Sequence, residues 1–161
     1  MQRLHAPGLE LRRAVVADLP AVVALQQAAY ARNRRLLGLE PLPLLADYAA
    51  IFATMEVWLA ERDGALAGAL ILEPRPADLL IWSIATDPAR QTAGLGRAML
   101  TAAETRAGQL GLTTMRLYTG TVLRHLVGWY GRHGYVVERL EQLADRDITH
   151  MVKPLGQGPR G

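Results

Sequence analysis

Hydrophobic and polar residues follow two different periods along the chain, and the changes of period divide it into strands and helices. Apolar runs of strand length occupy Leu9–Ala14, Val57–Glu61, Leu66–Glu73, Leu79–Thr86, Met115–Thr119, Tyr135–Glu141 and Ile148–Lys153. Apolar residues recur at helical spacing in Leu19–Tyr30, Leu44–Met55, the segment from Leu95 to about Leu110, and Val122–His133. Asp18 is placed to cap the first helix, with Pro20 in its first turn. Arg32–Pro43 is rich in arginine, leucine and proline, which predicts a loop or a broken helix.

The residues between these segments indicate how the strands connect. Asp63-Gly64 lies between two apolar runs, which predicts a tight hairpin. Leu79–Thr86 is apolar almost throughout, as expected of a buried central strand. A helix then leads to Met115–Thr119, so this strand, helix and strand should form a right-handed parallel crossover. The patterning therefore predicts a mixed α/β domain whose first and last strands are antiparallel.

A glycine loop, Gln91-Thr92-Ala93-Gly94-Leu95-Gly96, separates the central strand from the long helix. Unpaired backbone N–H groups converge at such a helix start, where the helix dipole is positive, so the loop predicts a phosphate site. A P-loop would need lysine after the last glycine, where Arg97 stands. A dinucleotide-binding motif would need a third glycine at Met99. Neither nucleotide motif fits.

Composition narrows the classes of function. The 161 residues suit one domain, and half of them are hydrophobic, so the chain as a whole should be ordered. The sequence has no cysteine and a single serine, Ser83, which excludes thiolate chemistry and a Gly-x-Ser-x-Gly hydrolase. No apolar run approaches the roughly 20 residues of a membrane span. The N-terminus lacks the apolar core of a signal peptide, so we expect a cytoplasmic protein without a membrane partner.

The charge does not indicate a nucleic-acid partner. The formal net charge is +3, and almost all the cations are arginine. A nucleic-acid-binding face would cluster them, but apart from Arg32, Arg34 and Arg35 they are scattered. We therefore expect no nucleic acid among the partners.

Two motifs resemble those of the GNAT superfamily of N-acetyltransferases. Gln-x-x-Gly-x-Gly before an amphipathic helix resembles the acyl-CoA loop of that family, and Asp87-Pro88 precedes it as in family members. Leu117-Tyr118-Thr119, followed by the run Trp129–Tyr135, resembles the family's second motif. With similar segments at both ends, the resemblance covers about residues 9–155. It implies one acetyltransferase-like domain over residues 1–155, a flexible tail over 156–161, and a helix-flanked central sheet with a splayed parallel pair.

The resemblance also implies a site for acetyl-CoA as cosubstrate. The pantetheine arm would lie where the parallel strands splay, beyond Ile84, and would pair as a pseudo-strand with Ile84 and Thr86, on either side of Ala85. The pyrophosphate would accept hydrogen bonds from the backbone of Gln91, Thr92, Ala93, Gly94, Leu95, Gly96 and Arg97. Glycine at two of these positions permits close approach because no Cβ intrudes.

In this family the acceptor amine attacks the thioester directly, without a covalent intermediate on the enzyme. By resemblance, Tyr130 is the general acid that protonates the departing thiolate. Trp82 and Ser83 stand where family members often carry a carboxylate. The helix before Tyr130 lacks the asparagine that commonly meets the pantetheine. The base therefore stays open, and the candidates are a water molecule or the carboxylates of Glu40, Asp47 and Glu73.

The acceptor is expected to be a primary amine of a small molecule or a peptide. The segment that varies with substrate in this superfamily corresponds to Tyr30–Tyr48, so Arg34, Arg35, Tyr48 and Trp82 are candidate acceptor-pocket residues. His125 and His133 lack metal-ligand spacing, so no metal is predicted. Superfamily members are often dimers, which makes a homodimer an expectation. The alternative function is a catalytically silent acyl-CoA-binding sensor, because the strand carboxylate and the asparagine are missing.

Overall fold

The computed structural model describes residues 2–90 and 93–156. Its strands are β1 (Arg3–Ala6), β2 (Leu9–Arg13), β3 (Glu56–Arg62), β4 (Ala65–Pro74), β5 (Leu79–Thr86), β6 (Thr114–Gly120), β7 (Val136–Gln142) and β8 (Asp147–Pro154). Its helices are α1 (Leu19–Ala29), α2 (Ala31–Leu37), α3 (Leu42–Leu45), α4 (Tyr48–Thr54), α5 (Leu95–Gln109) and α6 (Arg124–Arg132), with short 3-10 turns η1 (Val16–Asp18) and η2 (Pro88–Arg90).

The described strands form one mixed sheet in the order β1-β2-β3-β4-β5-β6-β8-β7. Neighbouring strands are antiparallel except β5 and β6, which are parallel. This arrangement confirms the mixed α/β fold with one parallel pair around the glycine loop. Strand β1 was not predicted, because a four-residue segment with one buried side chain carries little hydrophobic pattern. Of the predicted flexible tail, residues 157–161 lie outside the described residues.

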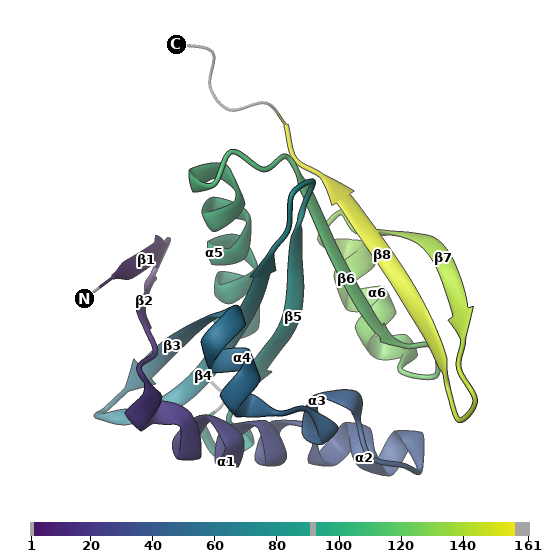
Figure 1. Cartoon of the computed structure of the whole chain (residues 1–161), viewed down its shortest axis with the longest axis horizontal. Coiled ribbons are helices and arrows are strands. Elements are labelled where there is room, and N and C mark those ends of the chain that lie inside the picture. Colours follow the sequence, from purple (N-terminus) through teal and green to yellow (C-terminus); the bar gives the residue numbers. More distant parts are fainter. Residues whose placement is uncertain (1, 91–92, 157–161) are drawn as a thin grey trace.

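The parallel pair separates early. Only Leu79, Leu80 and Ile81 of β5 pair with β6, so the separation begins before the expected position at Ile84. The cause lies in the neighbouring strand pair, where the β4–β5 register shifts so that Trp82 has no partner on β4. A residue inserted in this way bends its strand and increases its twist. Figure 1 shows β5 and β6 close together at one end and far apart near α1–α3.

Each face of the sheet has its own hydrophobic core. Alternate residues of one strand point to opposite faces, so Trp58 lies in one core and its neighbours Val57 and Leu59 lie in the other. The first core is covered by α5 and α6, and the second by α1 and α4. The long helix that follows the glycine loop is therefore fixed on one side of the sheet, and the segment α1–α4 on the other.

Two turns show where the predicted elements agree with the structure and where they differ from it. Asp63 and Gly64 both have positive φ, 52° and 76°, as the predicted tight hairpin requires. The predicted helix Leu44–Met55 is wrong in one respect, because Ala46 is extended and the helix starts again at Tyr48. Asp47 causes the restart, since its carboxylate accepts hydrogen bonds from the N–H groups of Ala49 and Ala50.

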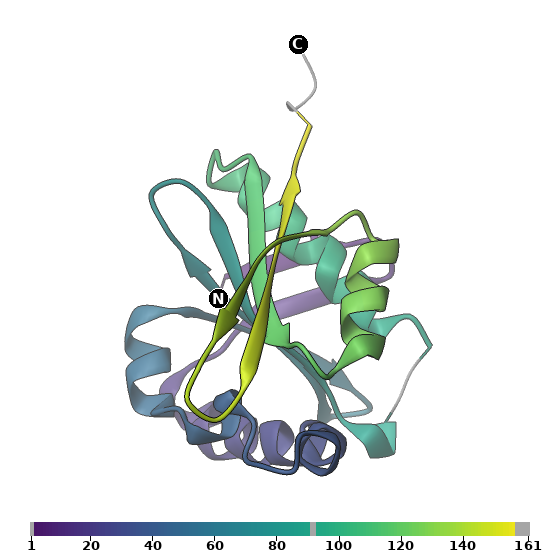
Figure 2. The ribbon, with the colours of Figure 1, turned by 90° about the vertical axis from the view of Figure 1, so that its right-hand side faces the viewer.

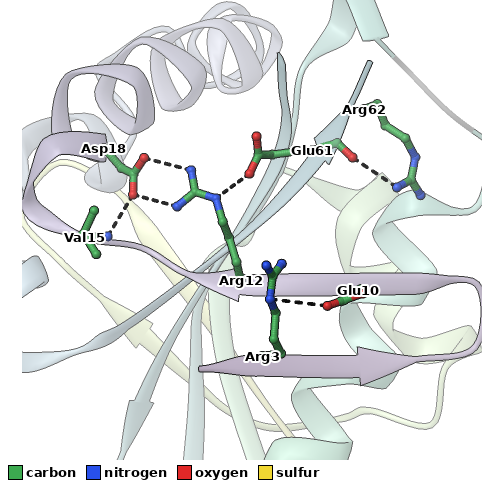
Figure 3. Close-up of polar contacts among 7 residues, drawn as sticks. All are labelled: Arg3, Glu10, Arg12, Val15, Asp18, Glu61 and Arg62. Carbon is green, nitrogen blue, oxygen red and sulfur yellow. Dashed lines mark hydrogen bonds and ion pairs between the residues drawn. The ribbon is translucent and has the colours of Figure 1, made fainter. Parts of the chain in front are cut away.

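Asp18 holds the expected N-cap position of α1, but its side chain does not cap that helix. The carboxylate instead accepts two hydrogen bonds of 2.9 Å from Arg12 and one of 2.8 Å from the Val15 N–H. Figure 3 shows Arg12 between Asp18 and Glu61, with which it also pairs. This ion-pair cluster ties the first turn of the helical segment to strands β2 and β3.

Candidate active site

A cavity of about 640 Å³ opens where β5 and β6 separate. Its walls come from the α1–α3 segment, β5 and the following η2, β6, α6, and the β7–β8 turn with the start of β8. Beyond Ile81, β5 keeps its pairing with β4 as far as Thr86, but its other edge has no strand partner among the described residues. The facing edge of β6 is likewise unpaired after Leu117. An extended ligand in this gap can therefore pair with backbone groups as an added strand does.

Four of the residues predicted for cosubstrate binding and catalysis lie on this cavity, together with Arg35 and Trp82 of the predicted acceptor pocket. Ile84, Ala85 and Thr86 line it from the unpaired part of β5, and Tyr130 lines it from α6. The strand and the helix that carry them are adjacent to the same gap. The structure thus brings together the residues expected to meet the pantetheine and the residue expected to act as the acid.

The described residues of the glycine loop do not line the cavity. Gln91 and Thr92 lie outside the described residues, and Ala93, Gly94 and Arg97 are exposed. Leu95 is different, because it is buried in the first hydrophobic core. A Cβ added to Gly96 would lie 3.8 Å from Trp129, which places the loop next to α6.

Helix α5 begins without a side-chain cap or an acidic residue in its first turn. Gly94 supplies the left-handed backbone, with φ of 83°, that lets the chain turn into the helix. The first intrahelical bond reaches Gly94 from the Ala98 N–H, so the three preceding helix N–H groups have no intrahelical acceptor. These groups form an electropositive site suited to an anion such as a phosphate.

Tyr130 is surrounded by aromatic rings. Its ring centroid lies 5.0 Å from that of Trp129 and 5.8 Å from that of Tyr135, both in edge-on arrangements. Burial raises the pKa of its phenol, and the nearby Tyr30 adds to the effect. No side chain of the described residues hydrogen-bonds the Tyr130 hydroxyl. The phenol is therefore protonated at neutral pH and keeps its proton available for a ligand.

Ser83, at the position where a carboxylate was expected, joins β5 to α1. Its Oγ lies 2.8 Å from Tyr30 Oη and accepts a hydrogen bond of 3.1 Å from Gln26 Nε2. Gln26 also donates to Tyr48 Oη, which donates in turn to the carbonyl of Pro43. Tyr48 was a candidate acceptor-pocket residue, but the structure buries it in this network, and burial raises its pKa to about 12.

The sequence analysis did not name Gln26 as a site residue, and it included Tyr30 only as the first residue of the segment expected to vary with the acceptor. Both lie on the face of α1 that also buries Val22, one helical turn apart from each other. A glutamine within an apolar helical stripe is the signal that could have found them, since buried amides need partners. Tyr30 lines the cavity, so the network fixes the orientation of one of its walls.

None of the three candidate carboxylates lines the cavity. Glu40 pairs with Arg34 at 2.8 Å, Asp47 caps α4, and Glu73 is near the end of β4. Within the described chain, the cavity lining contains no aspartate or glutamate at all. The lining does contain His125, whose pKa is lowered by burial and by the nearby Arg32. Its imidazole is therefore neutral at pH 7 and can accept a proton.

This arrangement of sheet, gap and helices agrees with comparisons with known proteins. Residues 22–135, more than half of the chain, match the family described as "Acetyltransferase (GNAT) family". The chain belongs to the GNAT family. The expectation drawn from the glycine loop and the Trp129-Tyr130 motif is thereby confirmed. No curated protein matches the chain.

Solved GNAT structures share the fold. The ribosomal-protein-S18-alanine N-acetyltransferase from Escherichia coli is 19% identical, with 94% of this chain and 98% of that chain covered and a TM-score of 0.73. The PaiA N-acetyltransferase from Thermoplasma acidophilum, solved with coenzyme A, is 16% identical, with 91% and 98% covered and a TM-score of 0.71. A GNAT protein from Elizabethkingia anophelis, solved with acetyl-CoA, is 18% identical, with 72% and 92% covered and a TM-score of 0.60.

Two further observations concern other classes of ligand for this GNAT domain. Among residues 2–90 and 93–156, no three histidine, aspartate or glutamate side chains gather closely enough to hold a metal ion. Within the same residues, every helix is too short or too polar to cross a bilayer.

Proposed function

We propose that this GNAT protein transfers an acetyl group from acetyl-CoA to a primary amine of a small molecule or peptide. The main support is the gap between β5 and β6. The unpaired edges of both strands and Tyr130 line the same cavity there. Family membership supports acetyl transfer in general. The uncapped start of α5 supports a phosphorylated cosubstrate, because its free N–H groups and dipole favour phosphate.

The cosubstrate would be held by backbone rather than by side chains. Ile84, Ala85 and Thr86 would pair with the pantetheine arm, and the residues from Gln91 to Arg97 would bind the pyrophosphate. Bound acetyl-CoA supplies a thioester carbonyl that an amine can attack directly. The chain offers no cysteine and only a hydrogen-bonded Ser83, which agrees with a reaction that needs no covalent enzyme intermediate.

Two proton transfers are then required. Tyr130 would donate its proton to the departing thiolate, which its raised pKa allows because the phenol stays protonated above neutral pH. His125 would accept the proton of the amine, directly or through water, since it is the neutral base on a wall without carboxylates. Glu40, Asp47 and Glu73 remain candidates only through a water relay.

Two measurements test this function. Acetyl-CoA at a hundred times its Kd should stabilise the protein by about 2.7 kcal/mol, seen as a rise in melting temperature. Release of free CoA thiol across a panel of amines, amino acids and peptides should then identify acceptors. Tyr130→Phe should lower kcat about a hundredfold or more and leave the acetyl-CoA-induced rise unchanged. A protein that acetyl-CoA does not stabilise would refute the proposal.

The second candidate function is a catalytically silent acyl-CoA sensor. The observation that favours it is the absence of a carboxylate from the described cavity lining. A sensor would be stabilised by acetyl-CoA but release no thiol with any amine, and Tyr130→Phe would change nothing. An enzyme would show release that depends on Tyr130.

The domain organisation, location and assembly of the protein are proposed as well. We place a single acetyltransferase domain over residues 1–155, in the cytoplasm, without membrane or nucleic-acid partners and in a homodimer. Size-exclusion chromatography with light scattering tests the last point directly.

A further inference from the structure

The cavity wall contributed by α2 carries two arginines without carboxylate partners. Arg32 and Arg35 both line the cavity, three residues apart on one face of the helix. Arg34, between them in sequence, does not line the cavity and pairs with Glu40 at 2.8 Å. In the described part of the chain, neither Arg32 nor Arg35 forms an ion pair. Their charges are therefore available to a ligand.

A third arginine reaches the same wall from the opposite end of the chain. Arg146 lies in the β7–β8 turn, and Figure 2 shows this turn close to the helices α2 and α3. Its guanidinium donates a hydrogen bond of 2.8 Å to the carbonyl of Glu40, and its side chain is only 7% exposed. It also pairs with Asp145 at 3.1 Å. Arg146 thus fixes the chain that follows α2.

The lining does not compensate the charges of Arg32 and Arg35. Asp145 pairs with Arg146, but no acidic side chain of the described residues lines the cavity beside the other two arginines. Charges of one sign on the wall of a partly enclosed cavity attract ligands of the opposite sign.

Resting on the proposed acetyl transfer, we propose that the acceptor is a small amine that also carries a carboxylate, which Arg32 and Arg35 bind. A guanidinium has a planar set of donors that matches a carboxylate, so an arginine pair selects this group over a neutral amide. The cavity of about 640 Å³ must also admit the acyl end of the cosubstrate. The acceptor is accordingly an amino acid or a short peptide with its own C-terminal carboxylate.

Matched pairs of acceptors test this inference. Each pair is an L-amino acid and its carboxamide, and free CoA thiol is measured with acetyl-CoA present. Because the carboxamide has a less basic amine, kcat/KM is expressed per unprotonated amine. The wild-type protein should prefer the acid by about tenfold to a hundredfold, as the loss of a charged hydrogen bond predicts.

Variants assign the preference to residues. Arg32→Gln and Arg35→Gln should raise KM for the acid more than KM for the carboxamide, and so reduce the preference. Arg35→Glu should favour the carboxamide over the acid. Arg34→Gln is the matched control from the same helix and should keep the wild-type preference. Each variant should show the wild-type rise in melting temperature with acetyl-CoA, since the altered side chains are exposed.

The outcomes separate this inference from the function on which it rests. Thiol release that is equal or faster with carboxamides would overturn the carboxylate assignment and leave acetyl transfer standing. Loss of preference in Arg34→Gln equal to that in Arg35→Gln would also overturn it. Binding of acetyl-CoA without release to any acceptor would overturn the proposed function, and this inference with it.

Discussion

His125 is the residue on the cavity wall whose charge changes nearest to neutral pH. Burial, assisted by Arg32, lowers its pKa below the ordinary value near 6.5. A base must be neutral to accept a proton, so kcat/KM should fall as the pH decreases through this lowered pKa. The pH profile of thiol release between about pH 5 and 8, on either side of the usual histidine pKa, should show this acid limb.

The limb should belong to His125 alone. His125→Gln should lower kcat/KM at pH 7 and remove the limb. His133→Gln is the control, because its Nδ1 lies 2.7 Å from the Trp129 carbonyl oxygen and the residue does not line the cavity. An acid limb that persists in His125→Gln would assign the base to another group.

Gly94 offers a test of the phosphate site at single-residue resolution. Its φ of 83° strains any residue with a Cβ, so Gly94→Ala should cost about 1 kcal/mol in free energy of unfolding. Because the same backbone orients the first N–H groups of α5, the variant should also weaken acetyl-CoA binding in a titration.

Gly111 provides the matched control for this variant. It has φ of 72°, and, as at Gly94, an added Cβ would meet nothing within 4 Å of the described structure. It lies beyond the other end of α5. Gly111→Ala should lose similar stability but bind acetyl-CoA normally. Equal loss of affinity in both variants would mean that strain, not the phosphate site, causes it.

At the scale of elements, one ion pair fastens α5 to the sheet. Arg106 donates hydrogen bonds of 2.9 and 2.8 Å to Glu56 on β3, and both side chains are largely buried. Burial alone would raise the pKa of Glu56, but the hydrogen bonds from Arg106 and Trp58 outweigh it and lower that pKa. The ion pair of Glu56 with Arg106 therefore stabilises the fold fully above the ordinary glutamate pKa. Its contribution is lost as the pH falls through the lowered pKa of Glu56.

Removing one partner should be costly because it leaves the other charge buried. We expect Arg106→Gln to lower the free energy of unfolding by about 3 kcal/mol in urea titrations. Arg3→Gln is the comparison, since Arg3 and Glu10 form an exposed pair on the same sheet and should contribute less than about 1 kcal/mol. A similar loss in both variants would contradict a special role for the α5 anchor.

Local sequence signals predicted the elements whose geometry is set by neighbours in the chain. Asp63-Gly64 specified its hairpin, and the turn at Gly94 specified the start of α5. The separation point of β5 and β6 was misplaced because it depends on the register of β4 against Trp82, which no local pattern encodes. The break between α3 and α4 was missed because the single cap at Asp47 outweighs helical spacing on both sides.

At the scale of the whole molecule, the features that the sequence did not predict depend on contacts between residues far apart in the chain. Ser83 and Tyr30 are separated by 53 positions, so their hydrogen bond could not be inferred from either segment. Arg32 looked like one of three clustered arginines, and only the packing of α2 shows that it faces the cavity while Arg34 faces away. The family motifs still predicted three residues that line the cavity, Ile84, Ala85 and Thr86, because these are consecutive in the chain.

The short pairing of β5 with β6 has a consequence for hydrogen exchange. Three residue pairs form the only ladder joining β1–β5 to β6, β8 and β7 within the described sheet. Amides on the open edges of residues 82–86 and 118–120 should exchange quickly in the free protein, and residues 79–81 slowly. Acetyl-CoA should slow exchange in the first two segments and leave the third unchanged. A ligand that fills the gap would then behave as a removable ninth strand, and saturation would make the two halves of the sheet unfold together.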